Sequence, residues 1–396
     1  MHFGLLNNDC LWVLDEVQLM GSGLATSTQL QAFREKLGTW GTVKTIWMSA
    51  TLRPDWLGTV DFSDKVSSLP PLELSADDRS TESLRKRLGA KKTFAPAGIA
   101  VGDKPEEVAK IATLIKHEHR AGSLTLVVVN TVERAQKLYK ALRHLSEHPS
   151  NRRRRRQEKT VDQTAAGGAQ PDLLLIHSRF RLPDRRERNT KLTLADKMCR
   201  GEPTSLLSTV ERDWIELIRQ NGLIVVATQV IEAGVDISAK TLFTELAPWP
   251  SLVQRFGRCN RFGEYDDAQV FWIDVPIGRK SLAAPYEDGE LEAARHILTS
   301  GNLHDVGPTA LAEYLENLPA ETSDKLFPYE PTHVIRRKDI LELFDATPDL
   351  AGNDIDIARF IRDDQKLDVQ VFWRAVDKEQ VPSPDDENGK APRREE

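Results

Sequence analysis

The chain has 396 residues, enough for two or three domains, and its 40% hydrophobic and 29% charged residues are ordinary for a globular protein. It contains no apolar run long enough to cross a bilayer and no basic segment leading into an apolar core at the N-terminus. Three widely separated cysteines form neither a disulfide framework nor a zinc knuckle, so a reducing cytoplasm is the expected location. The net charge of −6 argues against a protein that coats nucleic acid indiscriminately.

The first predicted strand is the short apolar run 11–14, which leads into Asp15 and Glu16. A carboxylate at the end of a strand can hold Mg²⁺, and a second one beside it can orient a water molecule. This is the Walker B arrangement of nucleotide hydrolases. Taken alone, an acidic turn after a strand is the commoner explanation of these two residues.

One helix later, the sequence predicts a second buried strand at residues 45–48, which runs into Ser49 and Thr51. Residues 53–98 are mixed in character and are interpreted as the rest of the same unit plus a linker. The first unit is therefore predicted to comprise residues 1–98.

A second unit is predicted over residues 99–275, where strands and helices alternate. Alternation of this kind predicts parallel α/β sheets with right-handed crossovers. The expected strands are residues 124–129, 173–176, 223–227, 242–246 and 270–275. In such sheets, ligands bind at the loops that follow the carboxyl ends of the strands.

A polar stretch at residues 147–170 interrupts this unit and contains five consecutive arginines, 152–156. Like charges in a row repel one another and resist folding, so a disordered surface insertion is predicted. From Arg134 to Arg188 the sequence has fifteen Lys and Arg against six Asp and Glu, a net charge of +9. This stretch could engage nucleic acid, although a solvated loop is the commoner explanation of the arginine run.

Polar residues after the later strands are the candidate binding residues of the second unit. They are Ser178, Arg179, Thr228, Gly234 and Asp236. Thr228 ends a strand of five apolar residues, and the last two lie on the loop that follows it.

A basic helix is predicted to begin at Ser251 and to end at Gly263. Gln254, Arg258 and Arg261 would share one of its faces, since they fall at i, i+4 and i+7. Guanidinium groups stay charged and can grip phosphate oxygens bidentately, so this face suits a polyanion. A solvated basic helix face is the alternative.

The pattern changes after residue 276, and residues 276–396 are predicted to form a small accessory region with a frayed polar tail. His304 and Asp305 form the pair that a metal-dependent nuclease would use. Such a nuclease needs several more ligands, so a loop histidine is the favoured explanation.

The order and spacing of these segments resemble the motifs of superfamily two helicases. Asp-Glu-x-Gln at 15–18 resembles motif II, Ser-Ala-Thr at 49–51 motif III, the strand at 124–129 motif IV, residues 227–236 motif V and residues 254–261 motif VI. Residues 14–21, 177–180 and 254–261 look like the helicase of type I CRISPR systems. Residues 337–345 and 368–374 resemble its I-U (also called I-G) branch.

The resemblance implies a partial first RecA-like lobe and a complete second one, which use ATP and Mg²⁺ to move along single-stranded DNA. Asp15 would coordinate Mg²⁺ and Glu16 would activate the attacking water, while Arg258 and Arg261 would sense the γ-phosphate. The remaining roles by resemblance are nucleotide binding for Gln18, Gly234, Asp236 and Gln254, DNA contact for Ser178, Arg179 and Thr228, and coupling of hydrolysis to lobe movement for Ser49 and Thr51.

One family feature does not occur in the sequence: the Gly-x4-Gly-Lys-Ser/Thr loop that cradles phosphates. The family's metal nuclease domain is not recognisable either. The chain is therefore expected to be a piece that hydrolyses ATP poorly alone and acts with an N-terminal helicase portion, a nuclease domain and the CRISPR surveillance complex. The alternative is an inactive remnant or adaptor that binds DNA or that complex. An RNA-remodelling helicase is disfavoured by the family-like tail.

Overall fold

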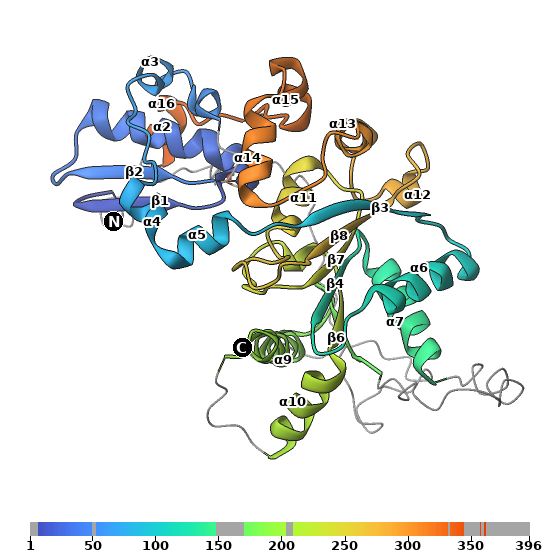
Figure 1. Cartoon of the computed structure of the whole chain (residues 1–396). Coiled ribbons are helices and arrows are strands. Elements are labelled where there is room, and N and C mark those ends of the chain that lie inside the picture. Colours follow the sequence, from blue (N-terminus) through green and yellow to red (C-terminus); the bar gives the residue numbers. More distant parts are fainter. Residues whose placement is uncertain are drawn as a thin grey trace, which may run out of the picture.

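The computed structural model describes residues 7–49, 53–147, 170–202, 209–331 and 333–343, together with residues 357, 360 and 361. Its strands form one sheet of two and one of six, both parallel (Figure 1). The predicted α/β class is confirmed.

The first unit is built on strands β1 (Cys10–Leu14) and β2 (Val43–Trp47), which pair with Leu14 opposite Trp47. Helix α2 (Ser22–Leu37) connects them, and it carries many of the unit's fully buried side chains. Parallel sheets are normally covered on both faces. Here alternate residues of β1 remain open, with Leu11 56% and Val13 52% exposed.

Short helical segments complete the first unit and lead to the second. They are η1 (Val17–Leu19), η2 (Pro54–Leu57), α3 (Ser63–Val66), α4 (Ala76–Ser80) and α5 (Glu82–Leu88).

The second sheet has the strand order β3-β8-β7-β4-β6-β5. Its strands are β3 (Thr93–Ala100), β4 (Leu124–Val128), β5 (Asp172–Ile176), β6 (Leu223–Ala227), β7 (Thr241–Glu245) and β8 (Gln269–Asp274). Every residue of β4, β6 and β7 is buried, as expected for central strands covered on both faces. The boundary placed between residues 98 and 99 falls inside β3, so this sheet begins earlier, at Thr93.

Helices cover both faces of this sheet. Figure 1 shows α6 (Pro105–Glu118) and α7 (Val132–Glu147) on one side and α9 (Leu182–Cys199) and α10 (Thr209–Asn221) on the other. The short helix α11 (Trp249–Phe256) follows β7. Because all strands are parallel, their carboxyl ends meet at one edge of the sheet, and the loops at that edge carry the candidate residues.

The C-terminal helices begin beside the second unit, where the first two lie in Figure 1, and the later ones return toward the first unit. They are α12 (Lys280–Ala283), α13 (Asp288–Thr299), α14 (Pro308–Glu316), α15 (Ala320–Leu326) and α16 (Arg337–Leu343). Asp324 pairs with Arg53 at 2.5 Å, and the Trp56 ring packs against Phe327 and Tyr329 with ring centroids 6.3 and 5.5 Å apart. This region therefore contacts both units.

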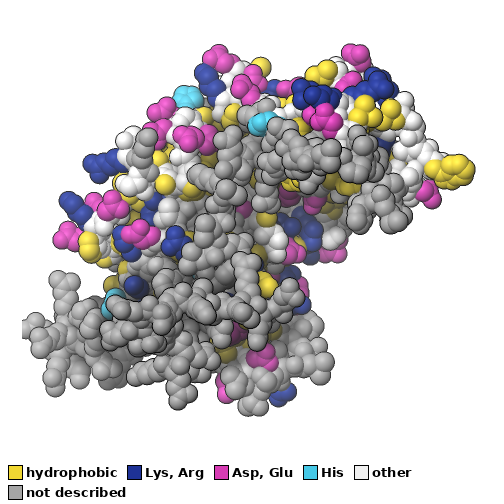
Figure 2. All heavy atoms as spheres, turned by 180° about the vertical axis from the view of Figure 1, so that it is seen from behind, with side chains coloured by type: hydrophobic (Ala, Val, Ile, Leu, Met, Phe, Trp, Pro, Cys, Tyr) yellow, Lys and Arg dark blue, Asp and Glu magenta, His cyan; other side chains and the backbone are white. Residues whose placement is uncertain are grey.

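Several predictions concern residues that the structure does not describe. They include Thr51, the tail residues 368–374 and all but the ends of the insertion at 147–170. Within the described ranges, no helix is long and apolar enough to cross a membrane. On the face drawn in Figure 2, Lys and Arg side chains are interspersed with Asp and Glu, so its described part presents no broad patch of one sign.

Candidate functional site

The acidic pair lies at the carboxyl end of β1, as predicted. Glu16 has a left-handed backbone, with a φ of 52°, and opens the short turn η1. Val17 on that turn is completely buried and anchors it. Asp15 is exposed, and its Oδ1 accepts the backbone N–H of Glu16 at 2.9 Å. The turn therefore presents two carboxylates next to each other at the end of the sheet.

A chain of side-chain hydrogen bonds joins this turn to the second unit. The Ser49 hydroxyl donates to Gln18 Oε1 at 2.5 Å, and Gln18 Nε2 donates to Glu16 Oε2 at 2.6 Å. The same Glu16 oxygen accepts from Gln254 Nε2 at 2.9 Å, although these residues lie 238 positions apart. The structure thus brings Ser49, Gln18, Glu16 and Gln254 together.

The basic helix is shorter than predicted. Helix α11 begins at Trp249, two residues before Ser251, and ends at Phe256 with Gly257 as its C-cap, well before Gly263. The backbone beyond it pairs with the segment before β7 instead, since Ala239 N–H donates to Arg258 O and Asn260 N–H donates to Ala239 O, both at 2.8 Å. The prediction that Arg258 and Arg261 share a helical face with Gln254 is therefore wrong.

The two arginines nevertheless lie close together in the loop after the helix. Arg258 is buried, and its guanidinium donates to the carbonyls of Ile231 at 3.1 Å and Glu232 at 2.5 Å. Burial lowers the pKa of Arg258 and the neighbouring charge of Arg261 lowers it further, while Asp236 and Glu16 oppose the shift. Two guanidinium groups near enough to repel each other favour an anion between them.

Arg261 connects this loop to the loop after β6. Its Nε lies 2.6 Å from Asp236 Oδ1, and its backbone N–H donates to the Ser238 hydroxyl at 2.8 Å. Gly234 lies on the same loop, exposed and with a φ of +71° that favours glycine. Of the residues predicted on this loop, Asp236 thus meets an arginine of the site, whereas Gly234 shapes the backbone.

The segment that links the two units contacts the loop that carries Arg258 and Arg261. Sequence reasoning did not predict this contact. Lys92 is buried, and its Nζ donates to the carbonyl of Phe256, the last residue of α11, at 2.8 Å. The guanidinium carbons of Arg87 and Arg200 lie 4.7 and 4.5 Å from the centroid of the Phe262 ring. Charged residues are usually exposed, so nothing in the sequence marks these contacts.

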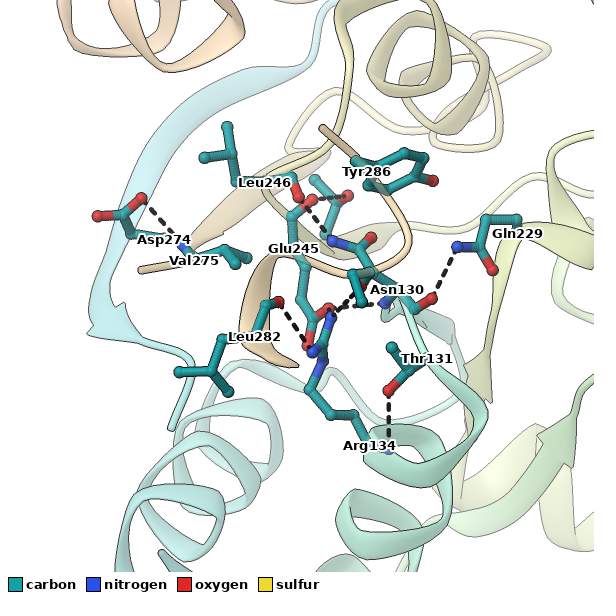
Figure 3. Close-up of polar contacts among 12 residues, drawn as sticks. Asn130, Thr131, Arg134, Gln229, Glu245, Leu246, Asp274, Val275, Leu282 and Tyr286 are labelled. Carbon is teal, nitrogen blue, oxygen red and sulfur yellow. Dashed lines mark hydrogen bonds and ion pairs between the residues drawn. The ribbon is translucent and has the colours of Figure 1, made fainter. Parts of the chain in front are cut away.

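A buried polar network supports the ends of β4 and β7 behind the site (Figure 3). Glu245 Oε2 accepts the Asn130 backbone N–H at 2.6 Å and two guanidinium N–H groups of Arg134 at 3.0 and 2.9 Å. The Asn130 side chain donates to Leu246 O at 2.7 Å, and Gln229 Nε2 donates to Asn130 O at 2.7 Å. Sequence reasoning missed this network as well, because its members lie on three separate segments of the chain.

The predicted DNA-contacting residues lie at the adjacent ends of β5 and β6. Thr228 N–H donates to Ile176 O at 3.2 Å, which places Thr228 beside the turn that carries Ser178 and Arg179. Ser178 and Arg179 are exposed, whereas Thr228 is only 2% exposed. The first two can therefore meet a ligand directly, and Thr228 offers it little surface.

An aromatic stack holds that turn. The buried His177 ring lies parallel to Phe180 with centroids 4.1 Å apart, and Arg188 of α9 lies 4.1 Å from the Phe180 centroid. Burial lowers the pKa of His177, and the charges of Arg188 and Arg179 lower it further. Burial and the neighbouring charges thus favour the neutral imidazole within the basic turn that opens helix α9.

The described residues fit only part of a nucleotide site. They contain no group of three or more His, Cys, Asp or Glu that could hold a metal by itself. Mg²⁺ is commonly held by one or two carboxylates together with substrate phosphates, and the exposed Asp15 suits that mode. A pocket of about 340 Å³ between β1 and α2 includes none of the predicted site residues.

Comparison with known proteins shows which proteins this part of the chain is similar to. Residues 121–264 match the family model for the CRISPR-associated nuclease/helicase Cas3, C-terminal. The CRISPR-associated helicase Cas3 of Thermoproteus tenax is 28% identical over 182 residues, which cover 46% of this chain and 23% of the relative. A putative CRISPR-associated nuclease/helicase Cas3 of Methanocaldococcus jannaschii is 27% identical over 150 residues, covering 38% and 15%.

The fold comparison agrees with the sequence comparison. The crystal structure of T. fusca Cas3-ADP superimposes with a TM-score of 0.51 at 18% identity, covering 78% of this chain and 35% of that one. The predicted RecA-like architecture is thereby confirmed. The chain spans less than a quarter of the length of the two curated relatives.

Proposed function

Because the chain is a relative of the Cas3-type CRISPR helicases, we propose that it forms part of an ATP-dependent DNA helicase or translocase of a type I CRISPR defence system in the cytoplasm. The observation that carries this proposal is the contact between the units, in which Gln254 Nε2 lies 2.9 Å from Glu16 Oε2. A carboxylate of one lobe and the arginines that follow α11 of the other then face the same space. Phosphoryl transfer needs a group that activates water and cationic groups that contact the γ-phosphate, both at the same site.

When bound, ATP and Mg²⁺ supply the γ-phosphoryl group and much of the charge neutralisation. Nucleotide use is supported by the similarity to T. fusca Cas3, whose crystal structure is that of Cas3-ADP. Asp15 would hold the metal, Glu16 would take a proton from the attacking water, and Arg258 with Arg261 would offset charge on the γ-phosphate. The nearness of the two guanidinium groups supports this role, because one phosphate group can pair with both.

The remaining residues would bind nucleotide or transmit its state. Gln18 and Gln254 share one oxygen of Glu16, and Ser49 extends this chain to the end of β2. We propose that closure of the lobes on nucleotide and their reopening rearrange this chain, which would couple hydrolysis to movement. Thr51 would act with Ser49, while Gly234 and Asp236 would shape the nucleotide side of the loop after β6.

The ends of β5 and β6 would hold single-stranded DNA. The support is the exposure of Ser178 and Arg179 and the run of Arg181, Arg185 and Arg186 at the start of α9. Helix N-termini and arginines both bind phosphate oxygens. Thr228 would contribute through its backbone position more than through its buried side chain.

The nucleotide site would be completed by another polypeptide segment. The sequence has no phosphate-cradling loop, which supplies the main contacts to the β- and γ-phosphates in such enzymes. The open face of β1, with Leu11 and Val13 more than half exposed, is where the rest of a first lobe would pack. An N-terminal helicase portion, a nuclease domain and the CRISPR surveillance complex are therefore the proposed partners. The missing loop also favours the second candidate function, an inactive remnant or adaptor that binds DNA or this complex.

DNA-stimulated ATP hydrolysis tests the proposal. We expect the purified chain to be nearly inactive alone and to gain activity with a polypeptide that carries the phosphate-cradling loop of a first lobe. Glu16→Gln and Arg258→Ala should each abolish the gain, whereas exposed substitutions away from the site, Glu313→Gln and Arg219→Ala, should not. Absence of any gain would favour the adaptor. Full activity of the chain alone would show that the site needs no completion.

A further inference from the structure

Arg255 lies between two residues of the proposed nucleotide site, Gln254 and Arg258, but has no assigned role. Its side chain is 0% exposed and lies in the last turn of helix α11. Arginine is almost never fully buried unless its charge is paired and its donors are satisfied. The surroundings of Arg255 meet both conditions.

Each of the five N–H donors of its guanidinium has an acceptor. Nε donates to Glu232 Oε1 at 2.7 Å, and the two Nη groups donate to Thr244 Oγ1 at 3.0 Å, Glu245 O at 3.1 Å, Asn130 Oδ1 at 3.0 Å and the Tyr286 hydroxyl at 3.1 Å. A guanidinium has five N–H donors in a fixed planar fork, so none is left over. Lysine, with one nitrogen, cannot reach five acceptors in this spread.

These acceptors belong to four segments that are far apart in sequence. Glu232 follows β6, Thr244 and Glu245 end β7, Asn130 follows β4, and Tyr286 belongs to the C-terminal region. Figure 3 shows Asn130, Glu245 and Tyr286, three of the residues that supply these acceptors, near one another at this end of the sheet. Burial alone would lower the pKa of Arg255, but Glu232, Tyr286 and Glu245 together raise it above its ordinary value, so the charge is retained.

Glu232 connects Arg255 to the proposed phosphate-sensing arginine. Its carboxylate accepts from Arg255 Nε, while its backbone carbonyl accepts from Arg258 Nη2 at 2.5 Å. The adjoining carbonyl, of Ile231, accepts from Arg258 Nε at 3.1 Å. The orientation of the Arg258 guanidinium therefore depends on a turn that Arg255 holds from the other side.

We propose that Arg255 is a positioning residue, which fixes the guanidinium of Arg258 by holding the turn at Ile231 and Glu232. Through Tyr286 it also ties the C-terminal region to that turn. The role of this positioning in hydrolysis rests on the function proposed above, whereas the positioning itself does not.

The test measures how fast phenylglyoxal modifies Arg258 in the full chain, resolved by peptide mass spectrometry. In the wild-type chain, burial and two carbonyl bonds should keep this rate low. Arg255→Lys should raise it about tenfold, which corresponds to about 1.4 kcal/mol, because the variant loses several hydrogen bonds from a charged donor. Glu232→Gln keeps the size of the side chain but weakens the same link, so it should change the rate in the same direction and by less.

Arg34→Lys is the matched control, because Arg34 is a buried arginine of the first unit with donors to Asn7, Gln31 and Thr45. It should leave the Arg258 rate unchanged. An unchanged rate in folded Arg255→Lys or Glu232→Gln protein would overturn the proposal, and Glu232→Gln keeps the test valid if the lysine variant does not fold. In the completed enzyme, Arg255→Lys should lower kcat with little change in KM. If Arg258→Ala leaves hydrolysis intact, the proposed function fails while the modification rates still decide the positioning.

Discussion

The ion pair of Glu245 with Arg134 should make Glu245 one of the most sensitive positions of the second lobe. Its carboxylate is 3% exposed and its partner 12% exposed, and it accepts three N–H groups at 2.6 to 3.0 Å. Glu245→Ala leaves the Asn130 backbone N–H without its acceptor and the Arg134 charge without its counterion. Removing one partner of a buried pair costs about 3–5 kcal/mol, a large part of the usual 5–15 kcal/mol stability of a domain.

Urea unfolding followed by tryptophan fluorescence measures this cost, because Trp249 and Trp272 are buried in the second lobe. The control is Glu187→Ala, which removes an exposed helical pair with Lys191 and should cost far less, because exposed ion pairs contribute little to stability. The double variant Glu245→Ala/Arg134→Ala should cost less than the sum of the single variants, because it leaves no unpaired charge. A Glu245→Ala cost as small as that of the control, or single costs that simply add, would refute this reasoning.

Two further perturbations test other parts of the site. In thermal unfolding, Gly263→Ala should destabilise the protein more than Gly278→Ala. Both glycines have a positive φ, +74° and +83°, so the backbone strain of the two substitutions is similar. A Cβ at Gly263 would clash with the carbonyl oxygen of Lys86, whereas a Cβ at Gly278 meets nothing within 4 Å. An equal loss of thermal stability in the two variants would show that Lys86 does not pack closely against Gly263. Burial lowers the pKa of His119, whose ring bonds Asn221 O and the Thr125 hydroxyl. The buried neutral His119 therefore contributes its full share of stability above the pKa of the unfolded state, about 6.5. This contribution is lost as the pH falls below that value, because the unfolded chain then binds protons more readily. His119→Gln should reduce the fall in thermal midpoint between about pH 7.5 and 5.5, and an unchanged fall would contradict this assignment.

The strands of the second lobe could be predicted because their burial leaves a direct mark on the sequence. A central parallel strand is covered on both faces, so it appears as a continuous apolar run, and the prediction of 223–227 coincides with β6, Leu223–Ala227. Strand β3 left no such mark, since it contains Pro96 and Gly98 and resembles a linker. Both residues are tolerated there because β3 is an edge strand with an irregular register between Pro96 and Ala100.

The sequence could predict which residues belong to the candidate site but not how they are arranged in space. The spacing of Gln254, Arg258 and Arg261 fits a helix, and a glycine such as Gly257 is tolerated inside a helical pattern, so local sequence does not fix the end of the helix at Phe256. The reason is a long-range one, the backbone pairing of residues 258–260 with Ala239. The buried positions of Lys92 and Arg255 were equally hidden, because a charged side chain in a sequence is expected to be exposed unless its partners are known.

Under the proposed function, the hydrogen bond between Glu16 and Gln254 holds the two lobes together only weakly. Glu16 Oε2 accepts from both Gln18 and Gln254, so the proposed base is held by amide groups. A single hydrogen bond to a carboxylate contributes about 1.5–3 kcal/mol at most, which a bound phosphate can outweigh by pairing with two guanidinium groups. Because the bond between Glu16 and Gln254 joins the lobes directly, any ligand that competes for either side chain changes the balance between their closed and open arrangements. The same side chains would then serve both chemistry and movement.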